Sequence, residues 1–463
     1  MEDYLYSLLK AYKKLPQPIK SLFGAIYNLL PRNLRYGKFY SEYLIRVSTF
    51  NKYNNFKDIE IEQSRLLFSN LSEAIKFVPF YKKYPLCESF SQFAKLPIIN
   101  KNVVVGSLSE LTNPNYNSLK LKTNTGGSSG TPMVFYLEKN KSRAKEKAHF
   151  DWFWGQFGYS KDSKILMLRG VPLQNGRNFE VNMIDNILNV SCYNINEDNI
   201  LPVLKEINLF KPEFIHGYPS SVKILTHLLE KYKNNLNISI KALFLGSEHL
   251  VHADRAFLEA FYNAKVVSWY GHTERLIHGG NCKYSHEYHF YPAYGYIELI
   301  DDQDKPVTQS GKEGRIIATG FDNKVMPFIR YDTGDLGVLS DKTECRCGFK
   351  GISLKEITGR GQDVILLTDN TKVSATAFIF GQHLDHFNKI REMQLQQEKA
   401  GELEMRIVKS VDFSNEEKKN MVELLEKSVD HKLKIDLVFV NDIEKTQRGK
   451  NIFFVSSLNK IRE

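Results

Sequence analysis

The sequence predicts an α/β fold with a large N-terminal domain of several lobes and a small α+β domain at the C-terminus. Three observations carry this prediction. Short apolar runs alternate with helical patterns between about residues 115 and 300, residues 294–340 look all-β, and a Gly-Arg-Gly turn at 359–361 precedes about 100 further residues. Alternation of this kind is typical of largely parallel sheets covered by helices. We expect the boundary near residue 360, giving domains 1–360 and 361–463.

Individual elements follow from periodicity. Apolar residues at three- and four-residue spacing predict helices in the first 90 residues, for example over 65–75, and again over 220–232. Short apolar or alternating runs predict strands at 165–168, 214–216, 242–245, 266–269, 296–300 and 315–319. The last 100 residues or so are expected to run strand, helix, strand, helix, strand.

Length and composition exclude several classes of protein. At 463 residues the chain is too long for one compact core, and 42% hydrophobic with 25% charged residues is ordinary for a globular protein. The net charge of +10 is spread along the chain without a block of like charges, so no nucleic-acid-binding arm is expected. We interpret the basicity as a solvated surface, with steering of polyanionic ligands or contact with an acidic membrane face as alternatives.

The N-terminal region and the cysteines bear on localisation. The chain starts with an acidic pair and no apolar core follows, so no signal peptide is visible, and no apolar run reaches the roughly 20 residues of a membrane span. An odd number of cysteines, five, argues against a disulfide framework. Together these features predict a cytoplasmic protein.

The segment 18–31 is amphipathic. Its apolar residues recur at helical spacing, and it is flanked by the basic residues Lys13, Lys14, Arg32 and Arg35. We expect a packed helix, with a helix lying on a membrane surface as the alternative.

A Gly-rich loop, Thr-Gly-Gly-Ser-Ser-Gly-Thr-Pro at 125–132, lies between strand-like runs at 118–122 and 133–137. Such a hairpin can turn backbone N–H groups and hydroxyls toward a polyphosphate, which predicts that the chain handles ATP. A plain Ser/Gly turn and a G-x-S-x-G nucleophile elbow are the alternatives. The elbow requires a strand-to-helix turn, whereas Pro132 and a strand-like run follow here. The loop also lacks the Gly-Lys-Ser/Thr ending of a Walker A motif.

Four further motifs carry candidate chemistry. In Trp-Tyr-Gly-His-Thr-Glu at 269–274, Thr273 and Glu274 follow a buried strand, where they suit a nucleotide and its Mg²⁺ or, alternatively, start a capped helix. In Tyr-Asp-Thr-Gly-Asp, Asp335 can accept two ribose hydroxyls or form an Asx-type turn. Thr-Gly-Arg-Gly-Gln-Asp at 358–363 is a flexible joint. Lys450, on a Gly-hinged loop, can bring a cation to developing phosphate charge or be a surface lysine.

The ordered set of these motifs resembles the adenylate-forming superfamily of acyl-CoA synthetases, luciferases and peptide-synthetase adenylation domains. Within it, the chain looks like the phenylacetate–CoA ligase branch and its CapK-like members of surface-polysaccharide gene clusters. The narrower resemblance is carried by Lys-Pro-Glu-Phe-Ile-His-Gly-Tyr-Pro-Ser at 211–220, Phe-Leu-Gly-Ser-Glu at 244–248 and the Glu274-Arg275 pair. It runs from about residue 60 to the end, so 1–360 is expected to be the adenylation domain and 361–463 the mobile domain.

The resemblance implies that a carboxylate attacks the α-phosphorus of ATP and expels pyrophosphate, after which a thiol or amine attacks the acyl-adenylate and releases AMP. Lys450, Thr273 and Glu274 are the implied catalytic residues: Lys450 bridges the α-phosphate and the carboxylate, Thr273 holds the α-phosphate and Glu274 holds Mg²⁺. Asp335 binds the ribose with support from Arg360. The remaining implied nucleotide-binding residues are Thr125, Ser128, Ser129, Gly130, Thr131, Gly246, Ser247, Glu248, Tyr270 and Gly271.

Ser247 and Glu248 are expected against the adenine or acyl pocket, and Tyr270 is expected to stack on the adenine. The C-terminal domain is expected to rotate near Gln362 between the two half-reactions. The superfamily usually has Asp or Lys at this hinge position, so Gln362 leaves the pivot residue open.

A second constellation suggests a structural zinc site. Cys345 and Cys347 form a thiolate pair on a turn, and Cys282 with a histidine would complete a tetrahedral set. The resemblance to CapK-like chains favours His289 over His286 as that histidine. Reduced core cysteines and surface histidines are the alternative interpretation.

The main functional hypothesis is an ATP-dependent acid ligase that passes its acyl group to CoA. The alternatives are transfer to an amine in surface polysaccharide synthesis, a non-catalytic scaffold that keeps the fold, and a serine hydrolase. Expected partners are a small carboxylic acid and CoA or an amine, without nucleic acid and without a membrane span. The oligomeric state is left open, with a homodimer as one option. Arg275 is expected to be either a structural ion-pair partner or the binder of a second anionic group on the substrate.

Overall fold

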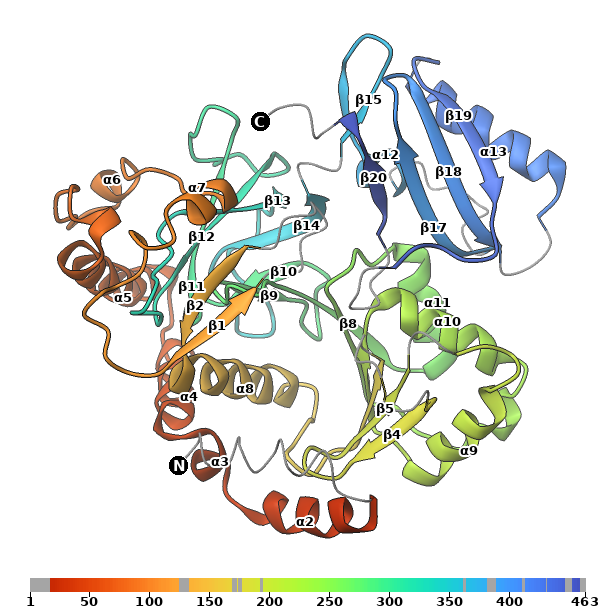
Figure 1. Ribbon diagram of the computed structural model, residues 1–463, viewed down its shortest axis with the longest axis horizontal. Coiled ribbons are helices and arrows are strands. Elements are labelled where there is room, and N and C mark those ends of the chain that lie inside the picture. Colours follow the sequence, from red (N-terminus) through yellow and green to blue (C-terminus); the bar gives the residue numbers. More distant parts are fainter. Residues whose placement is uncertain are drawn as a thin grey trace. The chain divides into compact units, whose positions relative to one another are not determined.

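The computed structural model describes residues 17–124, 133–168, 173, 177–191, 195–360, 364–380, 389–409, 413–429, 431–445 and 452–458. The chain forms two compact units built from separated stretches. Unit 1 comprises residues 1–163, 181–187 and 267–356, and unit 2 comprises 164–180, 188–266 and 357–463. The predicted α/β class with a small C-terminal α+β part is confirmed (Figure 1), and the boundary at residue 360 stays a prediction.

Unit 1 begins with helices, as its periodicity predicted. They are α2 (Gln17–Leu29), α3 (Arg32–Tyr36), α4 (Lys38–Phe50), α5 (Phe56–Phe77), the 3₁₀ turn η1 (Pro79–Tyr81), α6 (Phe90–Phe93), α7 (Lys101–Gly106) and α8 (Lys139–Gly155). In α5 the Asn55 side chain accepts a hydrogen bond from the Asp58 amide at 2.9 Å, which satisfies one free N–H of the first turn. Leu67 and Leu71, four residues apart, are buried on one face of this helix.

The strands of unit 1 form a hairpin and a sheet. The hairpin pairs β1 (Lys120–Asn124) with β2 (Val134–Glu138) in antiparallel register, which confirms the strands expected on either side of the Gly-rich loop. The sheet has the order β11-β12-β13-β14-β10-β9-β8. Its strands are β8 (Lys265–Gly271), β9 (His278–Gly280), β10 (Tyr288–Phe290), β11 (Gly295–Ile300), β12 (Glu313–Gly320), β13 (Tyr331–Leu339) and β14 (Ser353–Arg360).

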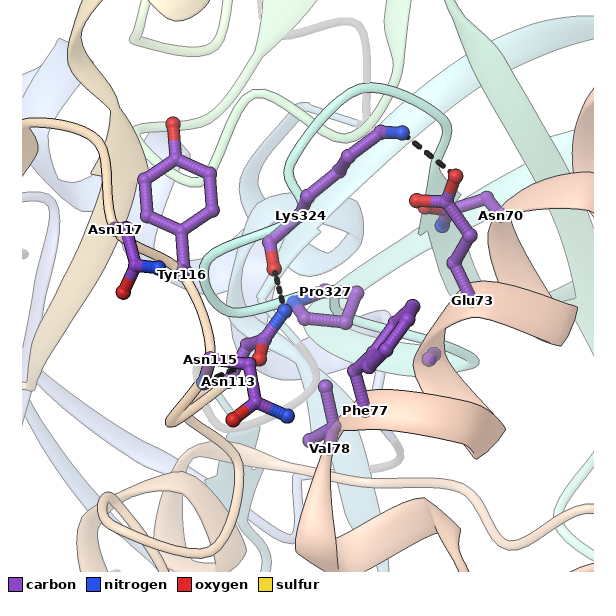
Figure 2. A pocket seen from close by; sticks show the side chains of 11 residues that line it. Asn70, Glu73, Phe77, Val78, Asn113, Asn115, Tyr116, Asn117, Lys324 and Pro327 are labelled. Atoms are coloured by element: carbon purple, nitrogen blue, oxygen red, sulfur yellow. Dashed lines mark hydrogen bonds and ion pairs between the residues drawn. The ribbon is translucent and has the colours of Figure 1, made fainter.

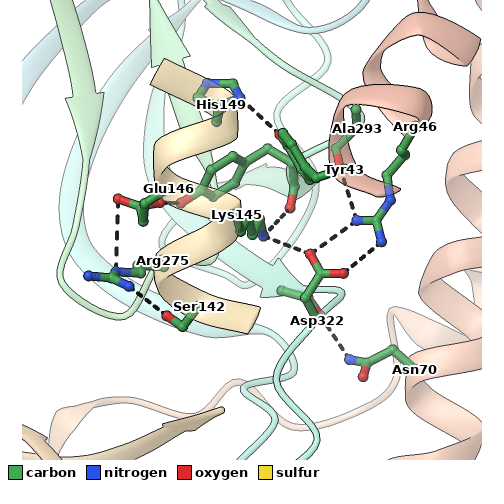
Figure 3. A network of polar contacts seen from close by, with 12 residues as sticks. Tyr43, Arg46, Asn70, Ser142, Lys145, Glu146, His149, Arg275, Ala293 and Asp322 are labelled. Carbon is green, nitrogen blue, oxygen red and sulfur yellow. Dashed lines mark hydrogen bonds and ion pairs between the residues drawn. The ribbon is translucent and has the colours of Figure 1, made fainter. Parts of the chain in front are cut away.

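A buried ion network ties three parts of unit 1 together (Figure 3). Asp322, which follows β12, accepts two hydrogen bonds from Arg46 of α4 at 2.7 and 3.0 Å and pairs with Lys145 of α8 at 3.0 Å. Lys145 also donates to the Tyr294 carbonyl at 2.7 Å. Burial alone raises the pKa of the Asp322 carboxyl, but Lys145 and Arg46 together hold that pKa well below its usual range.

Unit 2 contains the strands β3 (Ile165–Leu168), β6 (Phe214–Gly217) and β7 (Ala242–Gly246) and most of β5 (Ile187–Val190), together with the first two residues of β4 (Phe179–Asn182). The strand order is β7-β6-β3-β5-β4. The β3–β6 and β6–β7 pairs are parallel, as predicted, and every residue of β6 and β7 is buried. Buried parallel strands require crossover helices. These connections hold α9 (Ile200–Phe210), α10 (Pro219–Glu230), the turn η3 (Lys233–Asn235) and α11 (His252–Tyr262).

The C-terminal part of unit 2 has a hydrophobic core of its own, with members from Ile365 to Phe454. A hairpin, β15 (Val364–Leu366) with β16 (Lys372–Ser374), leads to α12 (Ala375–Phe380) and a four-stranded sheet of order β19-β18-β17-β20. That sheet comprises β17 (Ile390–Gln397), β18 (Glu402–Lys409), β19 (Lys434–Phe439) and β20 (Phe454–Ser456), with α13 (Asn415–Lys427) between β18 and β19. The chain thus uses two hairpins where alternating single strands and helices were expected.

Helix α2 corrects one expectation. The sequence predicted that its apolar face packs on the protein, but Leu22 and Phe23 are 63% and 56% exposed. Within the described residues, no helix has both the length and the apolar character needed to cross a bilayer.

The Asp322 network predicts a stability change. Asp322→Asn leaves two buried cations without their shared carboxylate, so we expect the free energy of unfolding to fall by about 3 kcal/mol in urea titrations at neutral pH. Because the folded-state pKa of Asp322 is depressed, this contribution is present above the unfolded pKa of about 4 and is lost as the pH falls through the folded value.

The gap in stability between wild type and Asp322→Asn should therefore narrow on acidification. The matched control is Glu197→Gln, which breaks the exposed pair with Lys231 and should leave stability nearly unchanged. Equal effects of the two substitutions would contradict the assignment.

Candidate active site

The candidate site of unit 1 starts where β8 ends. Tyr270 and Gly271 pair with Gly279 and His278 of β9 in antiparallel register, so residues 272–277 form a tight connection between the two strands. The Arg275 amide donates to the His272 carbonyl at 3.0 Å, and Arg275 has φ +58°. The alternative of a capped helix start at Thr273 is therefore wrong, because the chain turns into another strand.

Glu274 lies on this connection and is 7% exposed. The phenol of Tyr331, at the start of β13, donates a hydrogen bond to Glu274 Oε1 at 3.1 Å. Burial raises the pKa of Tyr331, and the charge of Glu274 raises it further. Thr273, next to Glu274, is half-buried. A carboxylate held by one neutral donor keeps lone pairs free, which suits a divalent cation with hard oxygen ligands.

Asp335 is brought to the same place by a bulge. Three residues of β13, Thr333, Gly334 and Asp335, lie opposite Ile316 of β12, because the register shifts there between Arg315 and Ile317. Gly334 has φ +76°, a left-handed conformation that costs a side chain free energy. Bulges of this kind redirect a side chain out of the regular ladder.

The redirected Asp335 carboxylate meets the end of β8. Tyr270 donates its phenol to Asp335 Oδ2 at 2.7 Å. Burial raises the pKa of Tyr270 well above its usual value, and the charge of Asp335 adds to this rise. Glu274 contributes a smaller effect in the same direction, which puts both carboxylates in the electrostatic surroundings of one phenol.

The sequence allowed an Asx-type turn at Asp335, but the side chain that forms such a turn is that of Asp332. The Gly334 amide donates to Asp332 Oδ1 at 2.8 Å, and Arg315 donates to Asp332 Oδ2 at 2.7 Å. The Thr333 hydroxyl donates to the Ile316 carbonyl at 2.9 Å and accepts from the Asp335 amide at 3.2 Å. Asp332 and Thr333 thus fix the bulge, whereas the Asp335 carboxylate accepts the hydrogen bond from Tyr270.

Of the two roles expected for Arg275, its contacts fit that of a structural ion-pair partner. Its guanidinium donates to the Ser142 hydroxyl at 2.7 Å and lies 3.8 Å from Glu146, both on α8 (Figure 3). Glu146 in turn accepts the phenol of Tyr294. Arg275 therefore holds the 272–277 connection onto α8.

The second group of predicted residues lies in unit 2. Gly246 ends β7, Ser247 follows with φ +71°, and Glu248 accepts a hydrogen bond from the Ser220 amide at 3.0 Å. Ser220 lies in the first turn of α10, whose N-cap residue supplies no side-chain bond. Glu248 therefore caps α10 and complements the positive end of its dipole. The expected contact of Ser247 and Glu248 with adenine or an acyl group stays a prediction.

Several predicted residues lie outside the described part of the structure. They are Thr125, Ser128, Ser129, Gly130, Thr131, the hinge residue Gln362 and Lys450. Arg360 ends β14, and its side chain is also outside the described part. Their roles stay predictions. Conversely, no role was predicted for Tyr331, although it belongs to a quoted motif; only the fold reveals that its phenol faces Glu274.

The four predicted metal ligands converge in unit 1. The ligand atoms of Cys282, His289, Cys345 and Cys347 all lie within 4.8 Å of one another, and the sulfurs of Cys282 and Cys345 are 3.6 Å apart. The Ser353 hydroxyl bonds His289 Nδ1 at 3.0 Å, whereas the buried Nε2 has no hydrogen-bond partner among the described residues. A donor set of three sulfurs and an oriented imidazole fits tetrahedral zinc.

Two cavities of unit 1 contain none of the predicted nucleotide-binding residues. One of about 250 Å³ is lined by Asn70, Glu73, Ala74, Phe77, Val78, Asn113, Asn115, Tyr116, Asn117, Lys324 and Pro327. Figure 2 shows that amide side chains and the Lys324–Glu73 ion pair gather around it. The other, of about 290 Å³, is rich in aromatic residues and reaches Cys347.

Comparisons with known proteins agree with this geometry. The crystal structure of 2-hydroxyisobutyryl-CoA ligase in its postadenylation state, with R3-HIB-AMP, superposes with a TM-score of 0.70 at 16% identity, covering 89% of this chain and 92% of that one. A family model described as the CapK C-terminal domain matches residues 367–457. Protein CapK of Staphylococcus aureus is 25% identical over 466 residues, covering 96% of this chain and 99% of that protein. These matches confirm the predicted resemblance to CapK-like proteins and to the fold of the adenylate-forming superfamily.

A second relative links the CapK-like chain to the predicted branch. Phenylacetate-coenzyme A ligase of Thermus thermophilus is 26% identical over 186 residues, which cover 38% of this chain and 42% of that protein. The predicted resemblance to the phenylacetate–CoA ligase branch is thereby confirmed.

The bulge predicts a backbone effect at one glycine. A Cβ added to Gly334 or to Gly106 meets no heavy atom within 4 Å, but only Gly334 has a positive φ. Gly334→Ala should lower the free energy of unfolding by about 1 kcal/mol or more, because an L-residue is strained there.

Gly106→Ala, the matched control at the end of α7, should be neutral or stabilising. Denaturant titrations of the two variants measure the difference. If the two variants were equally stable, the left-handed backbone at the bulge would be in doubt.

Proposed function

We propose that this protein is an ATP-dependent carboxylate ligase that forms an acyl-adenylate, releases pyrophosphate and transfers the acyl group to CoA. The observation that carries the proposal is the convergence of Glu274 and Asp335, from two separate motifs, on the phenols of Tyr331 and Tyr270. Each carboxylate has a neutral phenol as partner. This arrangement suits a nucleotide, because its ribose needs a hydrogen-bond acceptor and its bound cation needs an anionic oxygen ligand.

In the proposed mechanism Asp335 accepts the ribose hydroxyls, which exchange for the Tyr270 phenol now bonded to it. Tyr270 then stacks on the adenine, Thr273 holds the α-phosphate, and Glu274 is the protein ligand of Mg²⁺. When bound, Mg²⁺ neutralises phosphate charge. Ser128, Ser129 and Thr131 of the Gly-rich loop are assigned to the β- and γ-phosphates.

The first half-reaction forms a bond between a carboxylate oxygen of the acid and the α-phosphorus, while the α-phosphorus–oxygen bond to pyrophosphate breaks. In the second, the sulfur of CoA attacks the acyl carbon, its proton is lost, and AMP leaves with the electrons of the acyl–oxygen bond. Lys450 would stabilise charge only in the first step. We therefore propose that residues 361–463 rotate about the joint near Arg360 and Gln362 between the steps.

An amine acceptor is the second candidate function. The resemblance to CapK-like members of surface-polysaccharide gene clusters favours a setting in capsular or O-antigen polysaccharide synthesis, where amino sugars or amino acids could take the acyl group. Protein CapK of Staphylococcus aureus is similar to this chain over nearly its full length. A pyrophosphate-release screen over aryl, hydroxy-fatty, amino and uronic acids, repeated with CoA and with amines, tests both. AMP release that requires an amine and ignores CoA would favour the second function, and no pyrophosphate from any acid would refute both.

We propose that Cys282, His289, Cys345 and Cys347 hold a structural zinc ion. Four protein ligands leave no open position for a substrate, so the ion would stabilise the fold around β10 and residues 345–349. We also propose a cytoplasmic location, since none of the cysteines among the described residues is in a disulfide.

A substitution at Lys450 tests whether this residue acts in the first half-reaction only. Lys450→Ala should slow pyrophosphate release by at least about 10²-fold, the scale of losing one preorganised charge contact. Transfer from a pre-made acyl-adenylate to the acceptor should be nearly unchanged. The matched control, Lys419→Ala on the exposed side of α13, should keep both rates. An equal loss in both half-reactions would contradict the alternation.

Metal analysis of the purified chain tests the zinc assignment. About one equivalent of zinc is expected, falling below half an equivalent in Cys345→Ser together with a lower melting temperature. Cys87→Ser, at a buried cysteine outside the cluster, should keep the metal. Less than about half an equivalent in the wild-type protein would count against the site.

A further inference from the structure

Helix α2 exposes a continuous apolar stripe. Six residues at helical spacing, in and just after the helix, are 38–78% exposed: Ile19, Leu22, Phe23, Ile26, Leu29 and Leu30. In a helix they fall on one side, because residues three and four positions apart are neighbours. A group of large apolar side chains of this kind, gathered on one face, marks an interaction site rather than ordinary surface composition.

The opposite face of α2 holds the helix to unit 1. Gly24 is buried, and a Cβ there would come within 2.9 Å of Met183. Asn28 accepts a hydrogen bond at 2.9 Å from the buried Arg35, which also donates to the Ile184 carbonyl at 3.0 Å. The Arg35 guanidinium stacks over the Tyr27 ring at 4.5 Å.

Helix α2 is oriented oppositely to a core helix, which buries its apolar side and exposes its polar side. In α5 of the same unit the apolar residues Leu67 and Leu71 are buried. In α2 the small and polar side packs on the protein, and the apolar side faces outward. The helix lies at the lower edge of Figure 1, in red, beyond α3. A stripe held outward by specific contacts is available to a partner outside unit 1.

The charge of this region indicates what the partner is. Residues 4–41 contain no Asp or Glu and seven basic residues: Lys10, Lys13, Lys14, Lys20, Arg32, Arg35 and Lys38. Arg32, Arg35 and Lys38 are paired with Asp151, Asp185 and Glu42, and Lys20 is buried. The attraction to an anionic surface therefore rests on Lys10, Lys13 and Lys14 and on the net charge of +10 of the whole chain. A basic amphipathic helix combines apolar insertion with attraction to anionic lipid head groups.

We propose that α2 docks the protein on an anionic membrane surface, with Leu22, Phe23, Ile26 and Leu29 inserted at the boundary between head groups and acyl chains. The helix lies in the plane of the interface and does not cross it. The basic residues add long-range attraction of about 1 kcal/mol for each one near the surface. Binding of this kind is reversible and would bring an acid ligase close to lipid-linked or amphiphilic substrates.

Co-sedimentation with vesicles tests the proposal on the full chain without substrates. Vesicles of phosphatidylcholine alone are compared with vesicles containing about one third phosphatidylglycerol. We expect at least about tenfold stronger partitioning onto the anionic vesicles, weakened by roughly 0.5 M NaCl because salt screens the attraction. The triple variant Leu22→Ser, Phe23→Ser, Ile26→Ser should lose about tenfold or more of this binding.

The matched control is Ile45→Ser, Ile61→Ser, Leu86→Ser, which removes three apolar residues of similar exposure from elsewhere in unit 1. It should bind vesicles like the wild type, and both triple variants should keep their melting temperature and pyrophosphate release. Sedimentation equilibrium of the same proteins measures whether the apolar stripe of α2 instead contacts a second copy of the chain.

A wild-type dimer that the α2 variant dissociates, without vesicle binding, would show a contact between two copies and overturn the proposal. A monomer that does not bind anionic vesicles would also overturn it.

Discussion

The β-bulge at Thr333–Asp335 is the constraint on which the candidate site depends. A regular β13 would direct alternate side chains to opposite faces along its whole length, and Asp335 would follow that alternation. Three residues opposite Ile316, with a left-handed glycine among them, break the alternation and bring the carboxylate to Tyr270. The strain is offset locally, because Asp332 and Thr333 use their side chains to satisfy the polar groups of the bulge.

Tyrosine phenols are partners of both site carboxylates. Glu274 and Asp335 each accept a hydrogen bond from one phenol, a neutral donor that a ribose hydroxyl or a hydrated cation can replace. Exchanging a neutral hydrogen bond for a ribose hydroxyl is close to balanced in free energy, whereas breaking a buried ion pair is not. Several cations of unit 1 are used elsewhere: Lys145 and Arg46 hold Asp322, and Arg275 holds the 272–277 connection onto α8.

The sequence was sufficient for the fold class and for the buried strands β3, β6 and β7, because apolar runs are local signals that can be read along the chain. The convergence of Cys282, His289, Cys345 and Cys347 was predicted from ligand chemistry together with the resemblance to CapK-like chains, which favoured His289. The partners of Tyr331, Arg275 and Glu248 could not be predicted, because each contact joins segments far apart in the sequence. The orientation of α2 was missed for a related reason: periodicity reveals an apolar face but not what lies against it.

The family motifs therefore separate into two kinds. Glu274 and Asp335 accept hydrogen bonds from the phenols of Tyr331 and Tyr270 and suit ligand chemistry. In contrast, Arg275, Asp332 and Glu248 make contacts that hold a turn, a bulge and a helix end in place. Motif membership alone does not distinguish the two roles.

A crystal structure of the chain with a non-hydrolysable ATP analogue tests the central claim most directly. The account predicts that both ribose hydroxyls donate hydrogen bonds to Asp335 and that the Tyr270 phenol no longer makes its 2.7 Å contact with Asp335 Oδ2. A nucleotide bound elsewhere, with the Tyr270–Asp335 hydrogen bond intact, would contradict it.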